Sequence, residues 1–268
     1  MRYERVNNLA ASLHKIRKRG EASPLETYYK VIYSDAFIPL KRNKTYSKEA
    51  VHVMYGVKGG NTQALLLLDS NPTESADVWG DYYKKLKARG LQQVDLVVTD
   101  GLRGLNDVIH KHFPEADLQR CVVHKIRNVL NKVRPREKAI IASDLKELFN
   151  NFDTEASREK AKKKLANFCD RWREVYPAVA NAFAKEDLAC YFTYIKYPVA
   201  VRGMIYTTNS IENLNRQIRK VTKTKVSFDK ADNLLDVVFM VIKDFEGHHW
   251  QKYPVHGFKY WSKKTLLD

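Results

Sequence analysis

The chain has 268 residues, enough for one large domain or two modest ones with a real hydrophobic core. Its 47 Lys and Arg residues outnumber its 31 Asp and Glu residues, and the resulting formal charge of +16 favours a polyanionic partner such as nucleic acid. Three scattered cysteines and the lack of any apolar run near the ~20 residues that span a bilayer exclude a disulfide scaffold and a membrane protein. We therefore expect a cytoplasmic protein without a membrane partner.

The first part of the chain predicts three strands joined by short links, and therefore an antiparallel meander. Runs of β-branched, aromatic and aliphatic residues mark the strands. Gly59-Gly60-Asn61 is typical of a hairpin turn between the second and the third. The strands are expected at residues 28–35, 50–57 and 62–68.

Alternating helices and strands follow the meander. Residues 74–90 begin acidic, end basic and close with a glycine, which is typical of a helix. Residues 94–99 form a compact buried strand, and the helical crossover that leads to it favours parallel pairing with its neighbour. A short helix at 104–112 and a fifth strand at 117–123 complete the order β-β-β-α-β-α-β.

This order predicts a mixed α/β fold with a ribonuclease H-like sheet, in which a last helix packs on the sheet. Residues 125–200 instead indicate several helices, so we expect an all-helical insertion before the last catalytic helix, which should begin near Asn209. A further amphipathic helix is expected at about 230–246. The predicted domains are a basic N-terminal segment or linker (1–24), the first part of the core (25–124), the insertion (125–205) and the remainder of the core with a C-terminal helix and tail (206–268).

Three acidic residues stand at the ends of these predicted elements. Asp35 ends the first strand, Asp100 ends the fourth, and Glu212 lies in the first turn of the last helix. Each also has an ordinary structural interpretation: a turn residue for Asp35, a helix cap or Asp-Gly turn for Asp100, and a capping box with Asn209 for Glu212.

The joint placement of the acids favours a metal site over these separate interpretations. Strands one and four are neighbours in the predicted sheet, which brings Asp35 and Asp100 together, and the last helix brings Glu212 to the same edge. Crowded carboxylates repel one another unless a cation joins them. Their hard oxygen ligands suit two Mg²⁺ or Mn²⁺ ions.

A basic strip follows Glu212 along the last helix and indicates contacts with phosphates. Spacings of four, three and four residues place several of its members on one helix face with Glu212, although a solvated face with ordinary ion pairs is the alternative. The expected DNA-binding residues are Arg216, Arg219, Lys220, Lys223 and Lys225.

Cys121 and His124 form a C-x₂-H motif near the end of the fifth strand. A structural zinc site needs four ligands, and no second matching pair lies nearby. We expect Cys121 to be a buried strand residue and His124 to lie near the acids as a phosphate contact or a supporting residue.

Three blocks of the chain resemble the mutator-type transposases of bacterial insertion sequences. They occur in the family's order within a match over roughly residues 24–245, and they read PLETYYKVIYSDAF (24–37), VVTDGLRGLNDVIHKHFPEADLQRCVVHKIRNVL (97–130) and MIYTTNSIENLNRQIRKVTKTKVSF (204–228). The resemblance places the DDE triad on Asp35, Asp100 and Glu212, and the family's C-x₂-H motif on Cys121 and His124. It also implies a ribonuclease H-like catalytic domain with an all-helical insertion.

The resemblance implies a bacterial, nucleoid-associated enzyme that cleaves and joins DNA at insertion-sequence ends with two Mg²⁺ or Mn²⁺ ions. Its partners would be the element's terminal repeats, target DNA and a second copy of the chain, or more. Family members usually carry a helix-turn-helix region before the first acid, and only 34 residues precede Asp35, so we expect most of that region to be lacking. One alternative is a catalytically silent DNA-binding remnant or a truncated transposase of the same fold. Another is a simple nuclease that cuts without strand transfer.

Overall fold

The computed structural model describes residues 2–37, 50–73, 75–100, 104–183, 188–207, 209–222 and 231–261. The chain divides into two compact units. The first comprises Met1–Ala116 and Asn209–His256, and the second comprises Asp117–Thr208 and Gly257–Asp268. The second unit includes the whole of residues 125–205, the segment predicted as a helical insertion. No helix of the described part is both long enough and apolar enough to cross a membrane.

A sheet forms the centre of the first unit. The antiparallel meander is confirmed, because β1 pairs with β2 and β2 with β3 in antiparallel register. The parallel fourth strand is also confirmed, because β4 pairs with β1 and makes the order of these strands β3-β2-β1-β4. The strands are β1 (Tyr28–Phe37), β2 (Ala50–Lys58), β3 (Gln63–Asn71) and β4 (Gln93–Thr99).

The predicted turn between β2 and β3 forms because its residues tolerate a left-handed backbone. Asn61 has a φ of 66°, and asparagine is among the few residues that adopt this conformation readily. The Lys58 amide donates a hydrogen bond of 2.9 Å to the Thr62 carbonyl and closes the turn.

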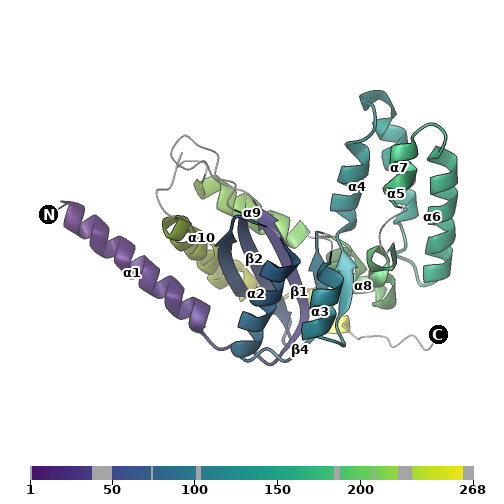
Figure 1. The fold of residues 1–268 in the computed structure, drawn as a ribbon. Helices are drawn as coiled ribbons and strands as arrows, with labels where there is room; N and C mark the ends of the chain where they lie inside the picture. Colours follow the sequence, from purple (N-terminus) through teal and green to yellow (C-terminus); the bar gives the residue numbers. More distant parts are fainter. Residues whose placement is uncertain are drawn as a thin grey trace. The chain divides into compact units, whose positions relative to one another are not determined.

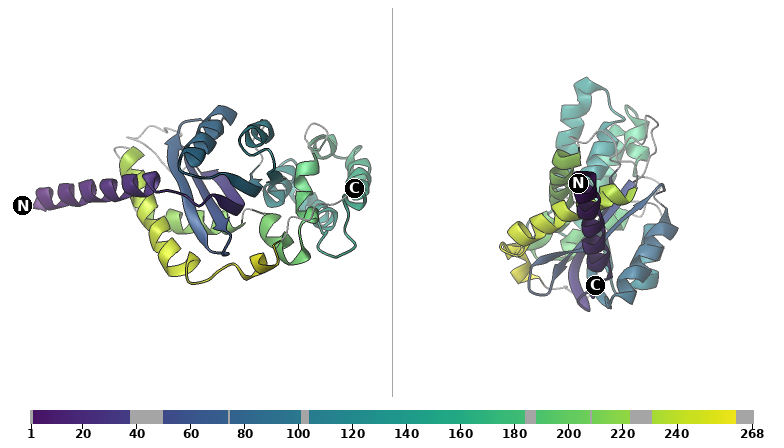
Figure 2. Two further views of the ribbon diagram at one scale, coloured as in Figure 1. Left: turned by 90° about the horizontal axis from the view of Figure 1, so that it is seen from below. Right: turned by 90° about the vertical axis from the view of Figure 1, so that its left-hand side faces the viewer.

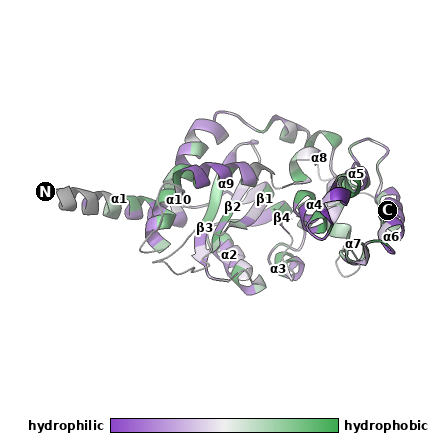
Figure 3. Ribbon diagram, turned by 90° about the horizontal axis from the view of Figure 1, so that it is seen from above, coloured by the Kyte–Doolittle hydropathy of each residue, from purple (hydrophilic) through white to green (hydrophobic). Residues whose placement is uncertain are grey.

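Helices cover both faces of this sheet (Figure 1). One face carries α2 (Ala76–Ala88), which Ser75 caps by accepting a hydrogen bond from the Val78 amide, and α3 (Leu105–His112). The other face carries α9 (Asn209–Thr222) and α10 (Ala231–Phe245). Both hydrophobic and hydrophilic residues occur along α10 (Figure 3), and its buried side includes Leu234, Val238 and Ile242. The predicted helices near residues 209 and 230 are therefore confirmed.

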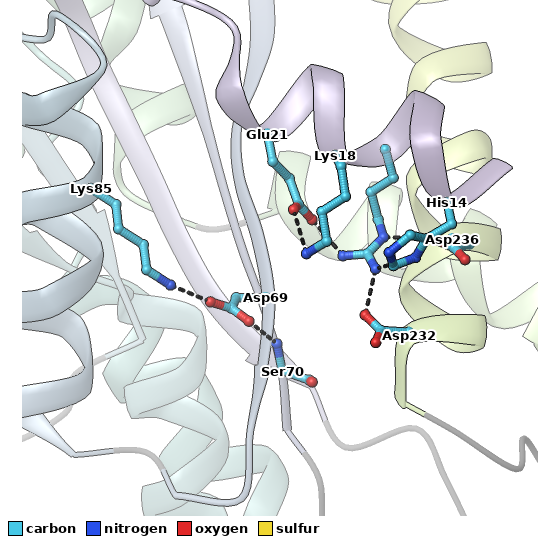
Figure 4. Close-up of polar contacts among 9 residues, drawn as sticks. His14, Lys18, Glu21, Asp69, Ser70, Lys85, Asp232 and Asp236 are labelled. Carbon is cyan, nitrogen blue, oxygen red and sulfur yellow. Dashed lines mark hydrogen bonds and ion pairs between the residues drawn. The ribbon is translucent and has the colours of Figure 1, made fainter. Parts of the chain in front are cut away.

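The N-terminal segment, predicted as a basic linker or remnant, forms the helix α1 (Arg2–Ala22), which packs against α10 (Figures 1 and 2). Its buried Arg17 donates hydrogen bonds to two carboxylates of α10, Asp236 at 2.6 Å and Asp232 at 2.5 Å. Figure 4 shows both carboxylates beside His14 of α1. Gly20 allows the close approach, because a Cβ there would come within 2.4 Å of the Phe239 ring. This segment is thus an ordered part of the first unit.

The second unit begins with a strand and continues mainly as helices. The strand β5 ends at Arg120 and is shorter than the predicted 117–123, because Cys121 is already the N-cap of the next helix. The main elements are β5 (Asp117–Arg120), α4 (Val122–Leu130), α5 (Lys138–Leu148), α6 (Arg158–Trp172), α7 (Pro177–Asn181) and α8 (Val199–Ile205). The remaining short helical turns of the chain are η1 (Pro135–Glu137), η2 (Leu188–Tyr191), η3 (Thr193–Lys196), η4 (Glu246–Trp250) and η5 (His256–Tyr260).

The buried imidazole of His52 makes the first unit sensitive to acid. His52 lies on β2 with no exposed surface, edge-on to Trp79 and Tyr82 at ring-centroid distances of 5.1 and 5.2 Å. Burial lowers the pKa of His52 from 6.5 to about 4. Between these values the unfolded chain binds a proton that the folded chain does not, so the folded state loses stability as the pH falls.

We expect this difference to cost the folded state about 2 kcal/mol between pH 7 and pH 5. Urea unfolding of wild type and His52→Met at both pH values measures it, because methionine fills a similar volume without titrating. The variant should lose less stability than wild type on acidification. An equal loss in both proteins would contradict the assignment to His52.

Candidate functional site

The first predicted acid, Asp35, is held in a fixed orientation inside the first unit. It lies on β1 and is 6% exposed. Its Oδ2 accepts a hydrogen bond of 2.8 Å from Asn215 Nδ2 on α9, and its Oδ1 accepts one of 3.0 Å from the Ala36 amide. The contact joins residues 180 positions apart, and it anchors the helix that carries Glu212 to this strand.

The second acid, Asp100, comes beside Asp35 through the register of the parallel strands. Ser34 of β1 is paired with Thr99, the last residue of β4, so Asp100 is the first residue after that strand. Asp35 follows Ser34 within β1, which continues to Phe37, so the prediction that Asp35 ends the first strand is two residues early. Neighbouring strands lie about 4.8 Å apart, so the register places the two acids at neighbouring positions. Asp100 is half-buried, and its Oδ1 lies 3.5 Å from the Thr99 hydroxyl. The expectation that strands one and four are neighbours is confirmed.

The third acid, Glu212, lies half-buried in the first turn of α9. It precedes Asn215 by three residues, which places both on the same side of the helix. Across the described residues, no group of three or more His, Cys, Asp and Glu side chains is arranged to hold a metal ion. The structure therefore brings Asp35 and Asp100 to neighbouring positions and joins α9 to Asp35, without a direct three-carboxylate cluster.

Asn215 was not recognised as a site residue in the sequence analysis. It interrupts the apolar side of α9, where Ile211, Leu214 and Ile218 are fully buried, and it is itself only 5% exposed. A polar residue within an apolar helical stripe is the signal that could have identified it. Its Oδ1 is buried and has no hydrogen-bond partner within the described part of the chain.

The oxygen atoms of these side chains suit a hard divalent cation as ligands. Asp35, Asp100 and Glu212 supply carboxylate oxygens, and the unpartnered Oδ1 of Asn215 adds an amide oxygen beside Asp35. Mg²⁺ and Mn²⁺ prefer such oxygen ligands. A buried acceptor without a donor costs free energy, which a cation or a water bound to one would recover.

The basic strip on α9 faces outward where the structure describes it. Arg216, Arg219 and Lys220 are exposed, and the guanidinium of Arg216 donates a hydrogen bond of 2.7 Å to Asn213 Oδ1. These side chains are therefore accessible to a polyanion. Lys223 and Lys225, the other predicted DNA-binding residues, lie outside the described residues.

The C-x₂-H motif lies in the second unit, at the start of α4. Cys121 is buried as expected, but it is the N-cap of α4 and not a strand residue, so that part of the prediction is wrong. Its Sγ accepts a hydrogen bond of 3.5 Å from the His124 amide and lies 4.0 Å from the Thr207 hydroxyl. These contacts give Cys121 a structural role at the turn from β5 into α4.

A family model and two related proteins all assign the chain to the same family. The family model described as "Transposase, Mutator family" matches residues 3–252. The transposase of insertion sequence IS905 from Lactococcus lactis is 33% identical over 241 residues, which cover 90% of this chain and 60% of the relative. The transposase of IS1201 from Lactobacillus helveticus is 32% identical over 206 residues, which cover 76% and 54%.

The chain thus spans 54 to 60% of the length of these two relatives. Among solved structures, the Drosophila P element transposase strand transfer complex matches 91% of this chain and 69% of that chain. The identity is 14% and the TM-score is 0.30, a likeness too distant to decide the fold.

Proposed function

The chain belongs to the Mutator family of transposases, and from this premise we propose that it carries the DDE catalytic site of such an enzyme on a ribonuclease H-like sheet. The observation that supports this most directly is the register of β1 and β4 near the end of β4. There the parallel register brings Asp100 beside Asp35, and Asn215 fastens α9 to Asp35. The order β3-β2-β1-β4 with β1 parallel to β4 is the arrangement expected for that sheet.

Asp35, Asp100 and Glu212 are the residues that would hold the cations. Two bound Mg²⁺ or Mn²⁺ ions would supply activation of a water or a DNA 3′-OH and stabilisation of the leaving oxygen. The protein's own part is to fix the ligands before binding. Asp35 is held by its bonds to Asn215 and the Ala36 amide. Asp100 directly follows β4, and Glu212 lies three residues before Asn215 on α9, the helix that Asn215 joins to Asp35.

DNA is the proposed substrate, in the form of the element's terminal repeats and a target duplex. Three exposed basic residues follow Glu212 on the same helix, at about one to two turns: Arg216, Arg219 and Lys220. Phosphates bound by them would lie near the acids. Processing of two element ends together requires a dimer or a larger assembly on DNA. A silent DNA-binding remnant of the same fold is the second candidate, and it would bind DNA without cutting it.

Metal dependence tests the proposal. The protein is incubated with linear DNA that carries an element end, in Mn²⁺, in Mg²⁺, in Ca²⁺ and in EDTA. We expect strand cleavage and joining in Mn²⁺ and Mg²⁺, and none in EDTA. Ca²⁺ is expected to support DNA binding without turnover, because its looser coordination does not enforce the geometry of attack. Equal cleavage in EDTA would overturn a two-metal site, and binding without cleavage in every condition would support the silent remnant.

Asn215 should act as a positioning residue for Asp35. Its replacement by alanine removes the 2.8 Å bond to the carboxylate and frees α9 from β1 at that point, so we expect activity to fall by about 10- to 100-fold, equivalent to ~1–3 kcal/mol. The matched control is Asn213→Ala on the same helix turn, which removes an exposed bond to Arg216 and leaves the bond to Asp35 in place. Calorimetric titration with Mn²⁺ provides a second readout, in which Asn215→Ala should bind more weakly. Unchanged Mn²⁺ affinity and unchanged activity would contradict the role.

A further inference from the structure

The second unit contains a cavity that the proposed catalytic site does not use. Its volume is about 520 Å³, and α6 forms one wall while α7 and η2 contribute to the other. Its apolar lining includes Leu165, Phe183 and Phe192, each less than 7% exposed. Other lining residues, such as Ala166 and Asn181, are exposed, so the cavity is open to solvent. Its size lies within the range of about 300–1,000 Å³ that is usual for ligand sites.

The charged lining of this cavity is entirely cationic within the described residues. Arg158 and Lys162 of α6 and its C-cap Arg173 contribute to it, and no described Asp or Glu does. The Nε of Arg158 is buried without a hydrogen-bond partner among described residues. Lys162 and Arg173 pair with solvent-exposed acids of their own helix, at 2.9 and 3.0 Å. Such surface pairs are weak enough for a phosphate to replace.

The rest of α6 is also rich in positively charged residues. Residues 158–173 contain seven Lys and Arg residues against two Asp and Glu residues. A polyanion would therefore be attracted along the helix, and the cavity opens beside it. Arg158 and Lys162 lie one turn apart, a spacing that suits successive contacts to one phosphate backbone.

We propose that this cavity receives an unpaired nucleobase of DNA, while Arg158 and Lys162 hold the phosphates beside it. This inference rests on the proposed function for its choice of DNA as the anion. A base is flat and largely apolar on its faces, so it fits a lining of Leu165 and the two phenylalanines, and aromatic side chains accept any base by stacking. The amide of Asn181, also in the lining, can donate to and accept from the base edge.

The test compares two duplexes of the same sequence context, one fully paired and one with a single unpaired adenine. Affinities for the 268-residue protein are measured by fluorescence anisotropy without divalent metal. Wild type is expected to bind the duplex with the unpaired base at least 10-fold more tightly. Ala166→Phe, which fills the cavity from α6 without changing charge, should abolish that preference. Its matched control, Ala178→Phe, places the same ring at an exposed position of α7 outside the cavity and should retain it.

The charge contribution is tested by a second pair of variants on α6. Arg158→Gln should weaken binding to the unpaired-base duplex more than to the paired one. Lys163→Gln, exposed and outside the cavity, should weaken both by the same factor. Thermal melting establishes that each variant folds. An unchanged preference in folded Ala166→Phe would overturn the proposal. So would a competition experiment in which a long-chain carboxylate displaces the duplex from the cavity and an oligonucleotide with an unpaired base does not.

The result is separable from the catalytic proposal. Asp100→Asn should lose cleavage yet keep the preference for an unpaired base, because Asp100 belongs to the first unit and the cavity to the second. If wild type shows the preference but never cleaves DNA, the cavity assignment stands and the catalytic one fails. Free dAMP that competes as well as the unpaired-base duplex would overturn the DNA assignment in favour of a mononucleotide site.

Discussion

Replacement of Asp100 by asparagine is expected to lower the rate of Mn²⁺-dependent cleavage of end-containing DNA by at least about 10³-fold, equivalent to ~4 kcal/mol of transition-state stabilisation. Asparagine keeps the size and one oxygen of the side chain but removes its negative charge. A neutral amide beside Asp35 would no longer balance a divalent cation, and the position next to Thr99 at the end of β4 would otherwise be preserved. Single-turnover cleavage at saturating protein measures the effect on chemistry without the contribution of DNA binding.

The same strand offers a matched control in Asp95. Asp95 is 8% exposed and accepts a hydrogen bond of 2.6 Å from the Tyr28 hydroxyl. It lies five residues before Asp100, near the other end of β4. Asp95→Asn makes the identical chemical change and should lower thermal stability while cleavage stays within about threefold of wild type. Equal cleavage by Asp100→Asn and wild type would remove Asp100 from the catalytic site, and equal loss in both variants would indicate a general folding defect.

Replacement of Arg202 by methionine is expected to destabilise the second unit by ~3–5 kcal/mol. Arg202 is 6% exposed, and its guanidinium donates to four backbone carbonyls, with bonds of 2.8 to 3.0 Å. The acceptors lie in two separate stretches of the chain, Asn151 and Asp153 in one and Ile195 and Tyr197 in the other. Methionine fills most of the volume but leaves these carbonyls without a donor, several of them in buried surroundings.

Hydrogen exchange and limited proteolysis would locate the effect of Arg202→Met. We expect faster exchange within residues 117–207 and little change in the amides of β1 and β2, which belong to the first unit. Arg171→Met is the matched control, because Arg171 is 63% exposed and pairs with Asp144 at the surface, where loss should cost no more than about 1 kcal/mol. A similar loss of stability in both variants would show that the hydrogen bonds from Arg202 to the carbonyls stabilise the unit no more than a surface ion pair does.

The local pattern of the sequence was sufficient to predict most of the elements. Strand boundaries agree to within about three residues for β1 to β4, because alternation, turn glycines and caps are properties of short segments. The neighbouring positions of Asp35 and Asp100 also followed from the sequence, since a helical crossover imposes parallel pairing. The strand expected at 117–123 was too long, because Cys121 begins a helix that an apolar run cannot distinguish from a strand.

The order of the elements, the positive charge and the three acidic residues could all be read from local patterns of residues. The long-range contacts could not: the bond from Asn215 to Asp35, the bonds from Arg17 to Asp232 and Asp236, and the cavity beside α6 exist only in the folded chain. These contacts join residues up to 219 positions apart. Local propensity does not encode such a pair. The two groups stabilise each other only when burial has removed both from water, so that each must find its hydrogen-bond partner in the other.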